Sequence, residues 1–250
     1  MNRILSIEKI DRFGRVVEIV SGSGSDQQEE AALAEPSLLD IDGKASHGRR
    51  RGVTLRVRVT PEEGEAFVIS VRRASGLGLR PGDELPPDTY AEIMQSLRSA
   101  CMQRCGTLLG SRDYPVHRLR TKLQDAGYPS SIIEDCIEKL QEAHYLDDAR
   151  YAQTYLRSHL ADRSLLRIRH DLLERGISEE LIERAVTEIA EETDPEEAQL
   201  GQIRRLLQKR GYDPADADYA ARQKIMAFLQ RKGYGINLIR RAMEKDFHLS

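Results

Sequence analysis

An internal repeat in the C-terminal two-thirds of the chain constrains its fold more than any other feature. Three glycines anchor it, each with apolar residues eight and four positions before and apolar pairs five, six, nine and ten positions after. Residues four apart share a helix face, and glycine ends a helix where the backbone turns left-handed. Each copy therefore predicts two helices joined by a glycine turn. The matching positions are Leu119, Leu123, Gly127, Ile132/Ile133 and Cys136/Ile137; Ile168, Leu172, Gly176, Leu181/Ile182 and Ala185/Val186; and Ile225, Leu229, Gly233, Leu238/Ile239 and Ala242/Met243.

Helix start signals fit the same frame. Ser131 with Glu134 forms a capping-box pattern, Ser178 precedes two glutamates, and Asp194 precedes a proline and two first-turn acids. A third helical segment follows the first two helix pairs, at 147–160 and 195–210. We therefore expect a connecting helix at 88–110, followed by three-helix repeats at 111–161, 162–211 and 212–250.

The first 87 residues predict a small antiparallel sheet. Segments 4–10 and 15–20 are rich in β-branched residues around a turn, and 54–60 alternates apolar residues with arginine before its partner at 66–71. Between the two pairs, 21–52 is rich in glycine, serine and charge without a period, which indicates a mobile insertion. The expected fold is mainly α: tandem three-helix repeats in an elongated array, with a small β region at 1–87.

Composition limits the classes of function. Of the 250 residues 32% are charged, none is tryptophan and three are cysteine, which fits a reducing compartment. The chain has no apolar run of the roughly 18 residues that a membrane span needs, and no signal-peptide pattern. We expect a cytoplasmic protein. The net charge of −3 hides a split, because residues 199–250 carry eleven basic and five acidic residues.

No sequence pattern predicts catalysis, a metal or a cofactor. The segments Gly43-Lys44-Ala45 and Gly76-Leu77-Gly78 are incomplete fragments of nucleotide-binding loops. Cys101 and Cys105 supply half of a tetrahedral metal site, and Cys136 occupies a core position of the repeat. The Asp147-Asp148 pair stands at a helix start, where capping explains it.

Basic residues, in contrast, recur in register. Nine positions before the anchor glycines stand Arg118, Arg167 and Lys224, and two copies add Arg120 and Arg169. Such a row fits phosphates or an acidic protein groove, although a solvated helix face is the commoner interpretation of any single cation. The tyrosines at 145, 151, 155, 212, 219 and 234 mostly fall on apolar faces, as core or boundary residues. The candidate binding set also includes Arg157, Arg163, Arg204, Arg205, Lys209, Arg210, Arg231, Lys232, Arg240 and Arg241.

The helical part carries three groups of motifs: Arg118, Lys122-Leu123 and Gly127; Tyr145-Leu146-Asp147-Asp148 with Tyr151-Ala152; and Arg167-Ile168, Leu172 and Gly176-Ile177. By these motifs it resembles the RecX family of recombinase regulators. The resemblance covers the chain from about residue 111 to its end. Two departures are that Ser164-Leu165 stands where the family usually has Gly-Pro, and that the β-containing region is less typical.

The resemblance implies a non-enzymatic modulator of RecA. Such proteins lodge in the groove of the RecA–DNA filament and restrain recombination, ATP hydrolysis and the co-protease activity behind the SOS response. The implied partners are the RecA filament and, secondarily, single- and double-stranded DNA, with no membrane and a monomeric state. Two alternatives remain open. A helical DNA-binding module would bind naked DNA as tightly as the filament, whereas an enzyme acting on nucleic acid is disfavoured by the missing metal-ligand cluster.

Overall fold

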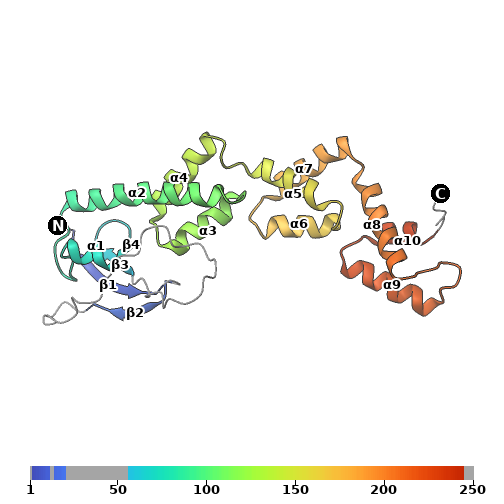
Figure 1. Cartoon of the computed structure of the whole chain (residues 1–250), viewed down its shortest axis with the longest axis horizontal. Helices are drawn as coiled ribbons and strands as arrows, with labels where there is room; N and C mark the ends of the chain where they lie inside the picture. The colour runs from blue at the N-terminus through green and yellow to red at the C-terminus, as the bar shows by residue number, and fades with distance from the viewer. Residues whose placement is uncertain (1, 12–13, 21–55, 245–250) are drawn as a thin grey trace, which may run out of the picture. The chain divides into compact units, whose positions relative to one another are not determined.

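A computed structural model describes residues 2–11, 14–20 and 56–244 (Figure 1). The insertion predicted at 21–52, with its Gly43-Lys44-Ala45 segment, lies outside the described residues. The chain divides into two compact units, one formed by 1–102 and 122–134, the other by 103–121 and 135–250. The mainly helical fold with a small N-terminal antiparallel sheet is confirmed.

The sheet has four antiparallel strands in the order β2-β1-β3-β4. They are β1 (Ile4–Ile10), β2 (Val16–Ile19), β3 (Arg56–Pro61) and β4 (Phe67–Ser70). Val57 and Val59 are buried, and the arginines between them are half-exposed, as the alternation predicts. In β1 the register shifts between Ile4 and Ser6, which breaks strict alternation and lets Ile4 and Ile7 both be buried.

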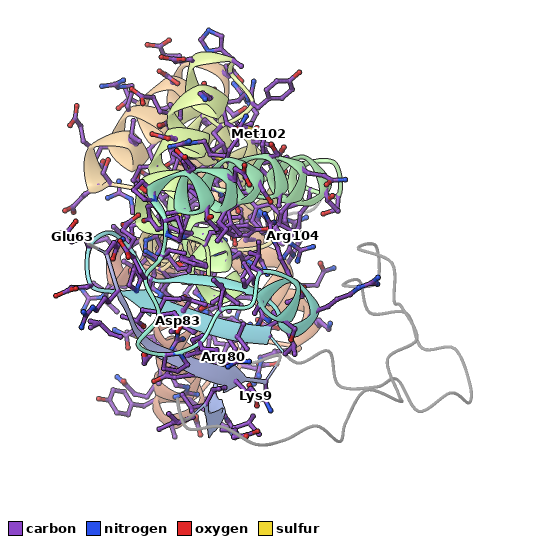
Figure 2. All side chains as sticks on the ribbon, turned by 90° about the vertical axis from the view of Figure 1, so that its left-hand side faces the viewer. Lys9, Glu63, Arg80, Asp83, Met102 and Arg104 are labelled. Carbon is purple, nitrogen blue, oxygen red and sulfur yellow. The ribbon has the colours of Figure 1, made fainter. Side chains whose placement is uncertain are left out.

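A short helix that the sequence analysis missed follows the sheet directly. The strand expected to reach Val71 ends at Ser70, whose side chain accepts a hydrogen bond from the backbone N–H of Arg73 and so starts α1 (Val71–Gly76). The loop after α1, where Figure 2 labels Arg80 and Asp83, is tied to β1. There the Ile4 N–H donates to the carbonyl of Asp83 over 3.0 Å. The helix expected at 88–110 is α2 (Pro87–Leu109).

Eight more helices complete the described part of the chain. No helix in the described ranges is both long and apolar enough to cross a membrane. The helices are α3 (Val116–Ala126), α4 (Ser130–Glu142), α5 (Asp148–His159), α6 (Leu165–Leu173), α7 (Glu179–Glu192), α8 (Pro195–Lys209), α9 (Tyr219–Arg231) and α10 (Ile236–Met243).

Two of the three expected helix caps are confirmed. Ser178 caps α7 and Asp194 caps α8, each through a hydrogen bond that its side chain accepts. The cap predicted at Ser131 is wrong, because α4 begins one residue earlier. The N–H of Ser131 instead donates to a carboxylate oxygen of Glu65 over 3.0 Å, so an acid from the sheet region stabilises this helix start.

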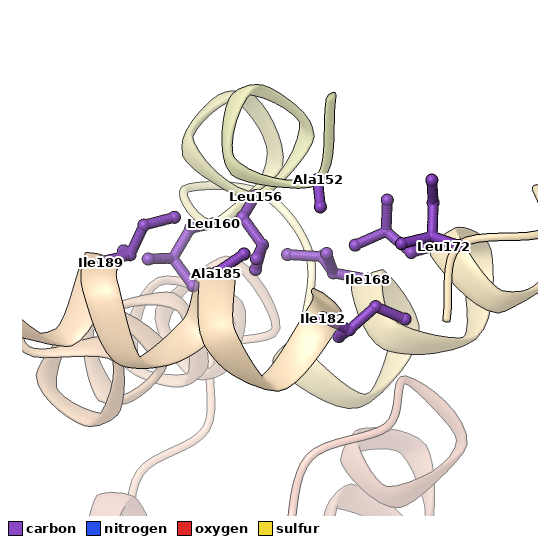
Figure 3. Packing of buried hydrophobic residues seen from close by; sticks show 9 residues of the cluster. Ala152, Leu156, Leu160, Ile168, Leu172, Ile182, Ala185 and Ile189 are labelled. Carbon is purple, nitrogen blue, oxygen red and sulfur yellow. The ribbon is translucent and has the colours of Figure 1, made fainter. Parts of the chain in front are cut away.

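Apolar packing groups the last six helices into two three-helix domains. One core joins Leu156 of α5 with Leu172 of α6 and Ile182 of α7 (Figure 3). A second joins Ile203 of α8 with Leu229 of α9 and, in α10, Ile239. Each domain therefore begins with the helix before its glycine hairpin, one helix earlier than the limits at 162 and 212. That helix covers the apolar face of the hairpin that follows it.

The anchor glycines end helices in the left-handed conformation, as predicted. Their φ angles are +86° at Gly127, +83° at Gly176 and +87° at Gly233. A Cβ at Gly176 would lie 2.4 Å from the Cβ of His117, and a Cβ at Gly233 would lie 2.6 Å from the Oγ of Ser164. Both the torsion angle and the close contact therefore require glycine.

We expect Gly176→Ala to lower the free energy of unfolding by more than the roughly 1–2 kcal/mol that left-handed backbone costs an alanine, because its Cβ would also clash with His117. Gly201→Ala is the matched control. Gly201 lies within α8, and no neighbouring side chain lies within 4 Å of where its Cβ would be, so alanine should stabilise by about 1 kcal/mol. Urea unfolding followed by circular dichroism measures both, and equal stabilities would contradict the prediction.

Candidate functional site

The row of cations expected from the repeat does not form one uniform surface. Arg118 donates from its Nη2 to the backbone carbonyl of Glu174 over 3.0 Å. Arg167 pairs through its Nε with Oδ1 of Asp171 over 3.1 Å. Lys224 is exposed and has no side-chain partner within the described residues. Equivalent positions of the repeat therefore have different roles.

Arg118 belongs to a recurring contact at the helix end before each anchor glycine. The carbonyls at such an end lack partners within the helix, and the end attracts positive charge. Arg56 donates to the Ala126 carbonyl over 2.9 Å, and the Oγ of Ser164 donates to the Lys232 carbonyl over 2.7 Å. Ser164 also caps α6, so one side chain stabilises the start of α6 and the end of α9. Sequence reasoning missed Arg56 and Ser164 here, because their partners are about 70 residues away.

Asp171 is the centre of a charged cluster that the sequence pattern did not reveal. Its side chain is only 5% exposed, and Oδ2 accepts hydrogen bonds from Arg163 over 2.6 Å and from the Tyr155 hydroxyl over 3.3 Å. The Arg175 guanidinium lies 4.6 Å from the centre of the Tyr155 ring. Burial by itself raises the pKa of Asp171, but the Arg163 hydrogen bond and the Arg167 charge outweigh it and lower the pKa below its usual value. This cluster stabilises the second domain.

Most other candidate arginines are also engaged within the chain. Arg157 pairs with Glu192 over 2.7 Å, which joins α5 to α7. Arg205 donates to the carbonyl of Ala161 over 2.9 Å. Such exposed contacts are each worth little in stability. The carboxylate of an ion pair offsets the charge of its arginine, whereas a backbone carbonyl only orients the side chain. The remaining engaged residues are Arg169 with Glu183, Arg204 with Glu197, Arg241 with Glu196, and the half-buried Arg120.

The available cations of the candidate set gather in the α8–α10 domain. Lys209, Lys224, Arg231 and Arg240 are exposed, and none has a side-chain partner within the described residues. Around them the charged groups of Arg210 and Lys232 lie 3.6 Å and 5.4 Å from the centre of the Phe228 ring. A cation over an aromatic ring keeps its charge, so both still contribute to a basic surface. This third domain can attract a polyanion or an acidic protein surface.

One group of side chains in the described part of the chain could share a metal ion. His170, Asp171 and Glu174 lie close enough to share an ion, but Asp171 is held by two arginines. Cys101, Cys105 and Cys136 form no disulfide and are buried, which confirms the core assignment of Cys136. Asp147 caps α5, as expected.

The expectation for the tyrosines holds for four of them. Tyr234 is buried, and the tyrosines at 151, 155 and 212 are half-buried. Tyr145 and Tyr219 are 68% and 78% exposed, so their assignment to core or boundary is wrong. Tyr219 is the first residue of α9 and Tyr145 precedes α5, where helix periodicity does not yet fix the direction of a side chain.

Family comparison matches the domains that the packing defines. Models described as the first, second and third three-helix domains of RecX match residues 101–140, 147–186 and 196–243. The second and third spans correspond to α5–α7 and α8–α10. The first begins inside α2, so the C-terminal part of the helix expected as a connector belongs to the first match.

Curated relatives carry the same family name. The chain is 33% identical over 151 residues to a regulatory protein RecX of Trichlorobacter lovleyi, which covers 59% of this chain and 96% of the relative. A regulatory protein RecX of Clostridium botulinum is 26% identical over 186 residues, covering 74% and 87%.

Two crystal structures share the fold. One of a regulatory protein RecX covers 81% of this chain and 98% of its own, with a TM-score of 0.55 at 23% identity. RecX from Lactobacillus salivarius covers 62% and 96%, with a TM-score of 0.52 at 20% identity.

We expect Asp171→Asn to destabilise the protein at neutral pH, because Arg163 and Arg167 then lose their charged partner. The lowered pKa of Asp171 means that its contribution is present above the unfolded-state pKa and is lost as pH falls through the folded value. The difference in the free energy of unfolding between wild type and variant should therefore shrink in strong acid. Urea unfolding at neutral and acidic pH measures it. Glu192→Gln, which removes an exposed pair, should cost under about 1 kcal/mol and serves as the control.

Proposed function

The chain belongs to the RecX family, and from this premise we propose that it regulates the recombinase RecA by binding the filament that RecA forms on DNA. Its relatives are named regulatory proteins, which supports a regulatory role. In this proposal the chain inhibits recombination, ATP hydrolysis and co-protease activity during DNA repair and the SOS response. It acts in the cytoplasm as a monomer, by binding and without a catalytic step or cofactor.

The observation that carries the proposal is the set of available cations on the third domain. A RecA–DNA filament presents phosphates and many copies of one protein surface, so charge attracts the chain to it. Tandem domains joined in one chain raise each other's local concentration, and several weak contacts then add up to tight binding. The internal contacts of Arg118, Arg163 and Arg167 support a structural role for those side chains, and the available cations support the third domain as the interface.

ATP hydrolysis by RecA on single-stranded DNA tests the proposal directly. Because a filament is a polymer, a regulator bound at few places should slow many subunits. We expect hydrolysis to fall with far less than one molecule of this protein per RecA subunit. Inhibition that begins only when the protein coats the DNA would contradict the proposal. It would favour the DNA-binding alternative, for which the gathering of cations in one domain is the supporting observation.

Charge reversal in the third domain should weaken filament binding. We expect at least about a tenfold loss of affinity and a smaller salt dependence. Each phosphate contact on single-stranded DNA contributes about 0.7 to the slope of log affinity against log salt concentration. A control with the same change in net charge should bind within about twofold of wild type. Equal loss in both variants would show that net charge alone matters. The test variant is Lys209→Glu, Lys224→Glu and Arg231→Glu, and the control is Arg3→Glu, Arg80→Glu and Lys139→Glu, all exposed and without a side-chain partner among the described residues.

A further inference from the structure

A groove lies where α6 meets the turn between α9 and α10. It has a volume of about 320 Å³ and is lined by Leu165, Leu166 and Arg169 on one side and by Gln230, Gly233 and Gly235 on the other, among others. This volume falls within the range of pockets that bind ligands and side chains. Gly233 carries no side chain at the point where this turn meets Ser164, so α6 and the turn approach closely beside the groove.

The groove offers apolar surface that no other part of the described chain covers. Leu166 is 63% exposed and, further along α6, Leu173 is 48% exposed. Leucines in the core of the same domain, such as Leu172, are fully buried. When an apolar side chain of a partner covers exposed leucines beside a groove, the apolar surface leaves water and the free energy of the complex falls.

The charges around the groove favour a negative partner. Its eight lining residues contain no carboxylate. Arg231 and Lys232, which precede Gly233, have no carboxylate partner within the described residues. Gly235 stands at the start of α10 without a side-chain hydrogen bond to cap that helix. The first N–H groups of α10 add to this positive field.

We propose that this groove docks an extended segment of a partner protein in which an apolar side chain is flanked by carboxylates. The apolar side chain covers Leu165 and Leu166. The carboxylates lie toward Arg231, Lys232 and the start of α10. The proposal adds a protein-docking site to the proposed function. It rests on that function only in taking the partner to be a protein of the RecA filament.

Gly235 gives a variant that separates binding from folding. Its backbone is extended (φ −67°, ψ 145°), and no atom lies within 4 Å of where a Cβ would be. In Gly235→Asp the new carboxylate caps α10 and repels the carboxylates of a ligand. Thermal stability should therefore be kept or raised while binding is lost. Gly235→Ala fills the same space without the charge and is the matched control.

The probe is the peptide acetyl-Asp-Glu-Leu-Phe-Glu-Asp-amide, titrated into the full-length ¹⁵N-labelled protein and followed by NMR. We expect the shifts to centre on the amides of Gly233, Gly235 and Ile236. Gly235→Asp and Leu166→Glu should each raise the dissociation constant at least about tenfold, and Gly235→Ala should leave it within about twofold. Leu166 is mostly exposed, so its replacement leaves the domain folded.

Comparison ligands test each part of the inference. Peptides with lysine in place of the acids, or serine in place of Leu-Phe, should bind much more weakly. The proposal would be overturned if either of these peptides bound as tightly as the acidic peptide. It would also be overturned if the acidic peptide shifted amides centred elsewhere in the protein. An oligothymidine that shifts these amides when the peptide does not would make the groove a nucleic-acid site. The titration contains no RecA, so a failure to bind the peptide would not contradict the regulation of RecA. In the same way, a protein that has no effect on RecA could still bind the peptide.

Discussion

The left-handed glycine turn inside each helix hairpin is the constraint on which the domains depend. At Gly176 and Gly233 the backbone has φ above +80°, and the missing Cβ leaves room for the preceding part of the chain. His117 occupies that room at Gly176 and Ser164 occupies it at Gly233. Arg118, next to His117, and Ser164 donate hydrogen bonds to carbonyls at the helix end. One residue type therefore fixes the turn within a domain and the contact with the segment before it.

Contacts within the chain also give several of the basic residues a structural role. Arg118 holds a helix end, and Arg163 and Arg167 neutralise the buried carboxylate of Asp171. A buried acid without such partners would cost several kcal/mol or take up a proton. Recurrence of charge in this chain thus reflects packing in the second domain, whereas in the third domain comparable cations stay available.

The third domain combines two features that suit a filament of protein and nucleic acid. Its unpaired cations provide attraction at long range, which sets the rate and salt dependence of association. The groove beside Gly233 provides apolar surface at short range, where the proposed segment would dock. The second domain, with its Asp171 cluster and the core around Leu172, supplies the rigid α6 that forms one wall of that groove.

The sequence by itself determined the helical class, the glycine hairpins and the strands, because the periods of 3.6 and 2 residues and left-handed glycines are local properties. The tertiary structure decided which helix completes each domain, since a repeat has a period but no fixed starting point. It also decided which cations are free. Arg157 and Glu192 are 35 residues apart, and Ser164 and the Lys232 carbonyl are 68 apart. Pairing at such separations depends on how helices pack, and no local pattern records it.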